Sequence, residues 1–192
     1  MTCVVLGGSR HVSKLGDEVR QRIDHIVRQD FQVVVGDANG ADKAFQKALA
    51  DRAYVNVQVF CSGGSPRNNL GNWDCQRVTT KARPGTFEFY AAKDRAMAEV
   101  ATVGFMLWDG VSVGTMLNVW RLMRQQKSSL VFIQLERRFF QVRGQDDWAK
   151  LLDLAAAETR DDIGRRIRGE MPSEHEKELP LFGPDLHTVG LS

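Results

Sequence analysis

The sequence predicts an α/β protein with a Rossmann-like, doubly wound and mainly parallel sheet of five or more strands, covered by helices on both faces. Short apolar segments alternate with longer amphipathic segments five times along the chain. Several of the apolar segments end in glycine-rich turns, as buried parallel strands do. With 192 residues, 43% of them hydrophobic and 26% charged, the chain can bury a substantial core and is not disordered throughout.

The first third of the chain contains three of the predicted strands. The first, 3–6, is short and β-branched and stops at two glycines. An amphipathic helix follows, with Ser13 as its expected N-cap and apolar residues on one face as far as Val27. The remaining predicted elements of this part are strand 31–35, an alanine-rich helix over 41–52 and strand 57–61.

Residues 62–90 interrupt the alternation and are predicted to form a long loop. Glycine, proline, asparagine and serine dominate there, and loops of this length in compact domains are usually functional or disordered. The predicted elements after the loop are helix 91–101, strand 103–108, an apolar helix after Thr115, strand 130–135, a short edge strand at 139–142 and helix 146–157. A capping box at 159–162 predicts the start of one more helix, which ends near 168. We therefore divide the chain into a Rossmann-like domain, 1–157, and a C-terminal helix with an extended acidic arm, 158–192.

Charge and composition narrow the class of protein. The net charge is +2, and acidic residues near the C-terminus leave the rest modestly basic, which suits a phosphate-bearing ligand and is too weak to indicate duplex DNA. No apolar run approaches the roughly 20 residues of a membrane span, and no secretory leader is present, so a cytoplasmic protein with no membrane partner is expected. The three cysteines lack metal-ligand spacing and are expected to be reduced thiols; no metal and no cofactor is predicted.

Glycine-rich turns follow three of the predicted strands and so lie at one edge of the predicted sheet. Ligands bind at that edge in doubly wound folds, and each turn leads into a helix whose N-terminus favours an anion. The pattern therefore predicts a phosphate-binding cradle, although neither the dinucleotide nor the P-loop consensus is present. Its candidate residues are Gly7, Gly8, Ser9 and Arg10 in the first turn, Gly36, Asp37, Gly40 and Asp42 in the second, and Gly110, Ser112, Gly114 and Thr115 in the third.

Four short motifs stand out within about residues 2–135: Gly7-Gly8-Ser9-Arg10, Gly36-x-x-x-Gly40-Ala41-Asp42, Lys93-x-x-x-Met97 and Asp109-Gly110-x-Ser112-x-Gly114-Thr115. Together they resemble the Rossmann-like superfamily that joins DNA-processing protein A to the Lonely Guy phosphoribohydrolases, the SLOG-type nucleotide-binding domain. The resemblance implies that nucleotides or nucleotide-derived signals bind at the carboxyl edge of the strands. For the Lonely Guy enzymes it implies cleavage of the N-glycosidic bond of nucleoside monophosphates.

The resemblance also assigns expected roles to single residues. Gly114 and Thr115 match a Gly-Thr pair that binds phosphate. The cation on the preceding helix is Lys93 if Met97 is aligned with the family's methionine, and Arg95 if positions are counted back from Gly114. Both alternatives are open, and either side chain would neutralise a phosphate.

The family's catalytic glutamate is replaced by Asn118. Asp94 and Asp109 are the carboxylates that could take its place, by orienting a ribose or activating water. The alternative for Asp94 is a solvated position at a helix start, and for Asp109 a simple Asp-Gly turn. Trp108 either stacks on a base or belongs to the core.

Three functions are thus open: a nucleotide N-glycosidase, a non-catalytic sensor of a nucleotide, and a DNA-processing accessory protein. Asn118 favours the sensor, whereas the Lys93-Asp94 pair favours the enzyme. The helix after Thr115 is apolar on most sides, so either a second copy in a homodimer or higher oligomer, or the C-terminal extension, should cover it. The acidic arm contains 178–182, Glu-Leu-Pro-Leu-Phe, which resembles the bacterial sliding-clamp peptide or else docks on its own protein.

Overall fold

The computed structural model describes residues 1–171, and its centre is one seven-stranded sheet in the order β4-β3-β2-β1-β5-β6-β7. All neighbouring strands are parallel except β6 and β7, which form an antiparallel pair. The strands are β1 (Cys3–Gly8), β2 (Gln32–Gly36), β3 (Val57–Ser62), β4 (Asp74–Val78), β5 (Val103–Trp108), β6 (Ser128–Ile133) and β7 (Arg138–Val142). The predicted fold class is confirmed.

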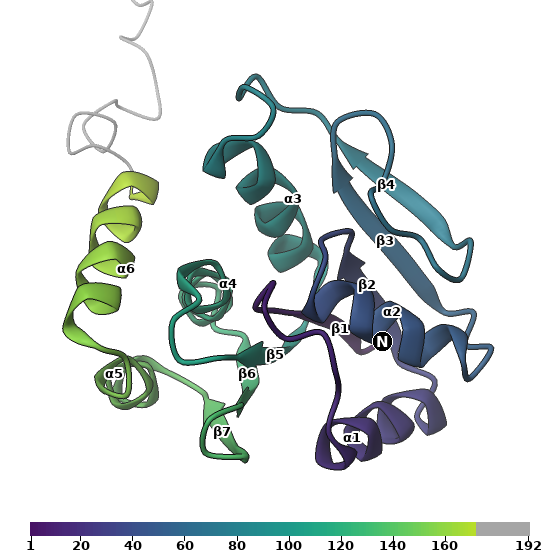
Figure 1. Ribbon diagram of the computed structural model, residues 1–192, viewed down its shortest axis with the longest axis horizontal. Coiled ribbons are helices and arrows are strands. Elements are labelled where there is room, and N and C mark those ends of the chain that lie inside the picture. Colours follow the sequence, from purple (N-terminus) through teal and green to yellow (C-terminus); the bar gives the residue numbers. More distant parts are fainter. Residues whose placement is uncertain (172–192) are drawn as a thin grey trace, which may run out of the picture.

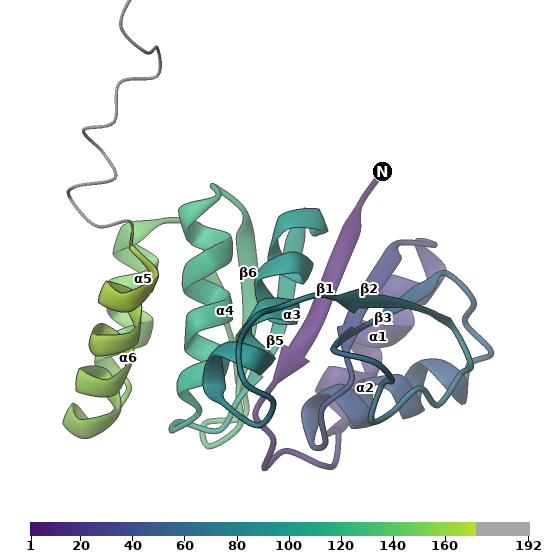
Figure 2. The same ribbon diagram turned by 90° about the horizontal axis from the view of Figure 1, so that it is seen from above.

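Within residues 1–171, six helices cover the two faces of the sheet (Figures 1 and 2). They are α1 (Asp17–Arg28), α2 (Ala41–Ala50), α3 (Phe87–Val100), α4 (Val113–Arg124), α5 (Gln145–Asp153) and α6 (Ala157–Glu170). Apolar residues of α1 and α2 pack on one face of the sheet and form one buried cluster. Those of α3 to α6 form a second cluster on the other face. The helices thus bury both faces, and this explains why the strands are apolar on both sides.

Strands β1 and β5 lie side by side at the centre of the sheet. The chain builds the sheet outward from β1 to β4, returns through α3 to β5, and then continues outward to β7. The connections after β1 and β5 therefore leave in opposite directions, which opens a crevice at the carboxyl ends of these two strands.

The structure corrects four of the predicted boundaries. Within the predicted loop 62–90 lies the edge strand β4, and α3 already begins at Phe87, where Thr86 caps it by accepting a hydrogen bond from the Phe89 amide. The side chains of β4 are exposed or half-buried, so its sequence carries no apolar signal. The N-cap of α1 is Gly16 and not Ser13, and α6 starts before the expected capping box, so both expected side-chain caps are wrong. Strand β6 covers 128–133 rather than 130–135.

The apolar helix α4 is covered by helices of its own chain. Met116, Leu117 and Val119 are buried, and α3, α5 and α6 all pack against α4. Ile163 of α6 is fully buried in the same cluster. The sequence left open whether a second copy or the C-terminal extension packs on this helix. Within residues 1–171 the extension does so through α6, so the burial of α4 is no argument for a partner subunit.

Two further predictions concern the segment 178–182 and membrane spans. The segment 178–182 lies outside the described residues. Among residues 1–171, no helix combines the length and the apolar character that crossing a membrane requires.

Candidate functional site

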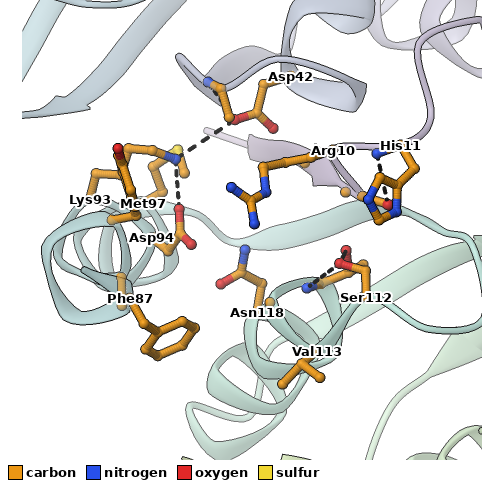
Figure 3. A pocket seen from close by; sticks show the side chains of 18 of the residues that line it. Arg10, His11, Asp42, Phe87, Lys93, Asp94, Met97, Ser112, Val113 and Asn118 are labelled. Atoms are coloured by element: carbon orange, nitrogen blue, oxygen red, sulfur yellow. Dashed lines mark hydrogen bonds and ion pairs between the residues drawn. The ribbon is translucent and has the colours of Figure 1, made fainter. Parts of the chain in front are cut away.

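A pocket of about 450 Å³ lies in the crevice beside β1 and β5 (Figure 3). Its walls come from the end of β1 and the turn after it, from the turn after β2 and the start of α2, from the loop after β3, from one side of α3, from the first turn and a half of α4, and from one residue of α6. Both polar and apolar side chains line it. They include Arg10, Asp42, Arg67, Phe87, Tyr90, Lys93, Asp94, Ser112, Gly114, Thr115, Asn118 and Arg166.

The N-terminus of α4 borders the pocket. Ser112 is its N-cap: the Ser112 hydroxyl accepts hydrogen bonds from the Thr115 amide at 3.4 Å and from the Thr115 hydroxyl at 2.9 Å. A Cβ atom on Gly114 would meet no other group within 4 Å, so the backbone faces open space there. Because the first amides of a helix lack intrahelical partners and carry the positive end of its dipole, this turn attracts an anion.

Arg10 extends over the same pocket from the turn after β1 (Figure 3). Its side chain is exposed, and within residues 1–171 its guanidinium takes part in no hydrogen bond or ion pair. A backbone hydrogen bond fixes this turn against the start of α2: the Ser9 carbonyl accepts from the Ala41 amide at 3.0 Å. Gly40, at φ 80°, permits this packing, since a Cβ there would overlap the Arg10 backbone. Arg10 therefore projects from a fixed turn, and its guanidinium donors have no partner among residues 1–171.

A buried group of three charges forms the floor of the pocket. The Lys93 ammonium lies 2.7 Å from an Asp94 oxygen and 3.7 Å from an Asp42 oxygen. Gly36 makes room for this group, because a Cβ at that position would overlap both the Asp42 carboxylate and the Lys93 ammonium. The fold therefore needs glycine at the end of β2 because any side chain there would overlap the charged group, and not because a ligand contacts it.

The electrostatics of this floor follow from one ammonium shared by two carboxylates. Burial raises the pKa of Asp42 to about 6, with Lys93 opposing and Asp94 adding to the shift. Burial also disfavours the charged form of Lys93, but attraction to Asp94 and Asp42 outweighs it and holds the pKa of the ammonium above its usual range. Lys93 is thus a fixed positive charge, and Asp42 is the group that can take up a proton.

Asp109 lies outside the pocket lining and links the turns after β1 and β5. One of its oxygens accepts from the Ser9 hydroxyl at 2.6 Å and contacts His11 Nδ1 at 3.1 Å, while the other accepts from the Val111 and Ser112 amides. Burial raises the pKa of Asp109, but these hydrogen bonds outweigh burial and lower it. A carboxylate with both oxygens occupied and a lowered pKa is poorly suited to act as a base.

A second link fixes the loop after β3. The Arg67 guanidinium donates two hydrogen bonds to Asp37, at 3.0 and 2.7 Å, and its carbon lies 4.6 Å from the centre of the Tyr90 ring. Asn68 donates to the Asp37 carbonyl at 2.8 Å. Arg67 and Tyr90 line the pocket. Asp37 lies outside the lining and fixes the position of the Arg67 guanidinium.

Helix α6 contributes Arg166 to the lining of the pocket. The guanidinium of Arg166 lies 3.9 Å from the centre of the Phe87 ring, and both residues line the pocket. At the end of α6, the Glu170 carboxylate pairs with Arg121 of α4 and Arg95 of α3. Glu170 thus links the three helices through ion pairs that lie outside the pocket lining.

The structure separates the predicted site residues into two groups. Those that line the pocket are Gly7, Gly8, Ser9, Arg10, Asp42, Lys93, Asp94, Ser112, Gly114 and Thr115; those outside the lining are Gly36, Asp37, Gly40, Arg95, Asp109 and Gly110. Of the two cations left open by the sequence, Lys93 faces the pocket and Arg95 binds Glu88 and Glu170. Trp108 is buried with 1% exposure and belongs to the core.

Sequence reasoning missed the aromatic and basic wall of the pocket. Phe87 and Tyr90 were assigned to the loop, although Thr86 before them is an N-cap residue and their spacing of three places both on one helix face. Arg67 carries no comparable local signal. Arg166 lies within a basic run of α6 whose contact with the pocket depends on how the whole chain folds back.

Comparison with known proteins finds a solved structure with a similar fold. No family model matches the sequence, and no curated protein matches it. Among solved structures, DNA processing protein A from Helicobacter pylori, described for a unique single-stranded DNA binding mode, aligns with a TM-score of 0.55 and 18% sequence identity over 88% of this chain and 81% of that one. At this level of identity the likeness shows a shared Rossmann-like α/β fold, which the sequence predicts.

Proposed function

We propose that the pocket binds a nucleotide, with a phosphate group at the N-terminus of α4 beneath Arg10. The observation that carries the proposal is that a helix N-terminus and an arginine whose donors have no partner within residues 1–171 converge on one pocket. Guanidinium groups and helix N-termini are both preferred partners of phosphate. A volume of about 450 Å³ is within the usual range for small-ligand sites and suits a nucleoside monophosphate.

The rest of the ligand would lie toward α3. Asp94 and Asn118 project toward the centre of the pocket (Figure 3) and offer a carboxylate and an amide to ribose hydroxyls. The Phe87–Arg166 and Tyr90–Arg67 pairs offer planar surfaces to a base.

Hydrolysis of the N-glycosidic bond is a second candidate activity. Asp94 favours it, since one of its oxygens is held by Lys93 and the residue borders the pocket. Asn118 favours binding without turnover, because its amide cannot act as a base and its oxygen already accepts from Arg121 at 2.5 Å. A sensor of a nucleotide is therefore the better supported form of the proposal.

Binding of single-stranded DNA is a further candidate, because the similar chain from Helicobacter pylori is described by that property. A nucleotide-sized pocket with Arg10, Arg67 and Arg166 at its rim would hold one nucleotide of a strand. If the chain binds single-stranded DNA, its affinity for oligonucleotides should rise with strand length.

The test is a panel of nucleoside mono- and diphosphates, ribose 5-phosphate and short oligonucleotides, followed by calorimetry, thermal shift and release of free base. We expect a mononucleotide to bind and to raise the melting temperature, since a ligand that binds only the folded state stabilises it. Base release would indicate a hydrolase, and binding only to oligonucleotides would indicate the DNA-handling alternative. Failure of every phosphorylated compound to bind would contradict the proposal.

Two matched pairs of variants locate the site. Arg10→Ala should weaken binding by roughly 10- to 100-fold, the loss of charge-assisted hydrogen bonds. Arg28→Ala, an exposed arginine at the end of α1 and at the opposite edge of the sheet, should leave it unchanged. Gly114→Val should block the approach of phosphate to the backbone, whereas Gly144→Val, at another position with no group within 4 Å of the added Cβ, should not. Normal binding by a folded Gly114→Val protein would place the ligand elsewhere.

A further inference from the structure

Two of the three cysteines meet at the edge of the sheet, away from the pocket lining. The Cys61 and Cys75 sulfur atoms are 3.5 Å apart, and both are free thiols. Cys61 is near the end of β3 and Cys75 is in β4, the last strand at this edge. The third cysteine, Cys3, is buried in β1 and takes no part in the pair.

The strand register places the two cysteines diagonally opposite each other on neighbouring strands. Val59 is the partner of Cys75 and Arg77 is the partner of Cys61, so the cysteines are offset by two residues. An offset of two keeps both side chains on the same face of the sheet. A disulfide bond needs a sulfur–sulfur distance of about 2.05 Å. The sulfur atoms, now 3.5 Å apart, would have to approach by about 1.5 Å, and β4 can move with them because it is an edge strand that pairs with β3.

We propose that Cys61 and Cys75 form a redox-active dithiol, which a hydroperoxide converts to a disulfide in the folded protein. This proposal is independent of the ligand proposed above.

The two thiols differ in access, and this sets the order of the steps. Cys75 is partly exposed, whereas Cys61 is fully buried, and burial together with the neighbouring thiol raises the pKa of Cys61 to about 11. The thiolate of Cys75 would attack the peroxide O–O bond, forming a sulfenic acid and releasing water or an alcohol. The sulfur of Cys61 would then attack the sulfenic sulfur, and a second water would leave with its hydroxyl group. Two thiols are oxidised by two electrons, and one peroxide is reduced.

The disulfide would close the chain around the loop that carries Arg67. Residues 62–74 lie between the two cysteines, and within them Arg67 reaches Asp37 and Tyr90. Strand β4 pairs with the sheet only through β3. A covalent link would hold this edge strand in place and restrict the unfolded chain, and both effects favour the folded state.

The experiment treats the folded full-length chain with a small excess of hydrogen peroxide and measures thiols, intact mass and peptides. We expect the three free thiols to fall to one, the mass to fall by two hydrogen atoms, and dithiothreitol to reverse both changes. Trypsin cleaves after Arg67, so the disulfide would join peptides 53–67 and 68–77 in a digest made without reductant. The oxidised protein should melt at a higher temperature than the reduced one.

Variants separate this reaction from other oxidation. Cys3→Ala should still form the disulfide, whereas Cys61→Ser and Cys75→Ser should not, and neither should gain stability with peroxide. Because the wild-type peptide map identifies the linked pair by itself, the proposal stays testable if a variant fails to fold. Three thiols that persist in folded protein, a sulfinic acid on Cys75 with Cys61 unchanged, or disulfide-linked dimers would each overturn it.

Discussion

At the scale of single residues, the distinctive feature is one ammonium shared by two carboxylates at the floor of the pocket. Lys93 contacts Asp94 closely and Asp42 at a longer distance, and all three are largely withdrawn from water. A buried lysine and aspartate can remain charged together, but a second buried carboxylate adds an uncompensated negative charge. Asp42, the more deeply buried carboxylate with the longer contact, therefore has the raised pKa.

This arrangement predicts a dependence of stability on pH that Asp42→Asn should remove. Asp42 has a pKa of about 6 in the folded protein and an ordinary value of 3.8. Between these values the folded state binds the proton and the unfolded state does not, so stability falls as pH rises from about 4 to 6. The free energy of unfolding of the wild type, relative to Asp42→Asn, should therefore fall by roughly 1 to 3 kcal/mol over that range.

The measurement is urea unfolding of both proteins at a series of pH values. Taking the difference between them cancels the opposite contributions of Asp37 and Asp109, whose pKa values are lowered by their hydrogen bonds. A difference that is constant from pH 4 to 7 would show that Asp42 is ionised throughout.

Which residues would meet in the site could be predicted from the sequence only in part. The turns after β1 and β5 were predicted to face one pocket because strand ends of a parallel sheet share an edge, and their residues do line it. The choice between Lys93 and Arg95 could not be made from spacing. Two residues apart on a helix, they point to different sides, and only the position of the sheet under α3 shows which side is buried.

At the scale of elements, α6 is held by a small charged cluster as well as by apolar packing. Glu170 and Arg121 are both nearly inaccessible to solvent, with side-chain exposures of 8% and 5%. Burial raises the pKa of Glu170, but the pairs with Arg121 and Arg95 outweigh it and lower the pKa below its usual range. The carboxylate therefore remains charged at neutral pH and balances the buried guanidinium of Arg121.

Glu170→Gln should accordingly destabilise the protein by about 3 kcal/mol or more, since it leaves the charge of Arg121 buried without a partner. Hydrogen exchange of the α6 amides, 157–170, should increase before that of the sheet. Glu158→Gln is the matched control, because Glu158 is exposed on the same helix and makes no ion pair within residues 1–171. Equal stability of the two variants would mean that apolar contacts such as those of Ile163 alone hold α6.

The elements that the sequence predicted best are those buried on both sides. Strands β1, β2, β3 and β5 are apolar runs with glycine at or just after their C-terminal ends, and all four appear close to their predicted limits. Strand β4 was missed because it lies at the edge, where one strand partner and mostly exposed side chains remove the apolar pattern. The start of α3 was missed because proline and glycine before Thr86 made the surrounding segment read as loop.

At the scale of the whole molecule, the pocket joins segments from both ends of the described chain. The turn after β1, the first turns of α3 and α4, and α6 all contribute side chains to it. The sequence predicted the contribution of the strand ends, because sheet topology implies it. The contribution of α6 depends on packing against α4, which no local pattern in 157–170 specifies.

If one ligand contacts all of these segments, its binding must stabilise them together. We therefore expect a bound nucleotide to slow hydrogen exchange in 7–11, 87–94, 112–118 and 157–170, by a factor that grows with the ratio of ligand concentration to Kd. Helix α1 and strand β7, which contribute nothing to the pocket lining, should be protected much less. Arg10→Ala at the same nucleotide concentration should lose protection in all four segments at once, because that residue acts only through the shared ligand. Protection confined to 7–11 and 112–118, with 157–170 unchanged, would mean that α6 is a wall of the fold and not of the binding site.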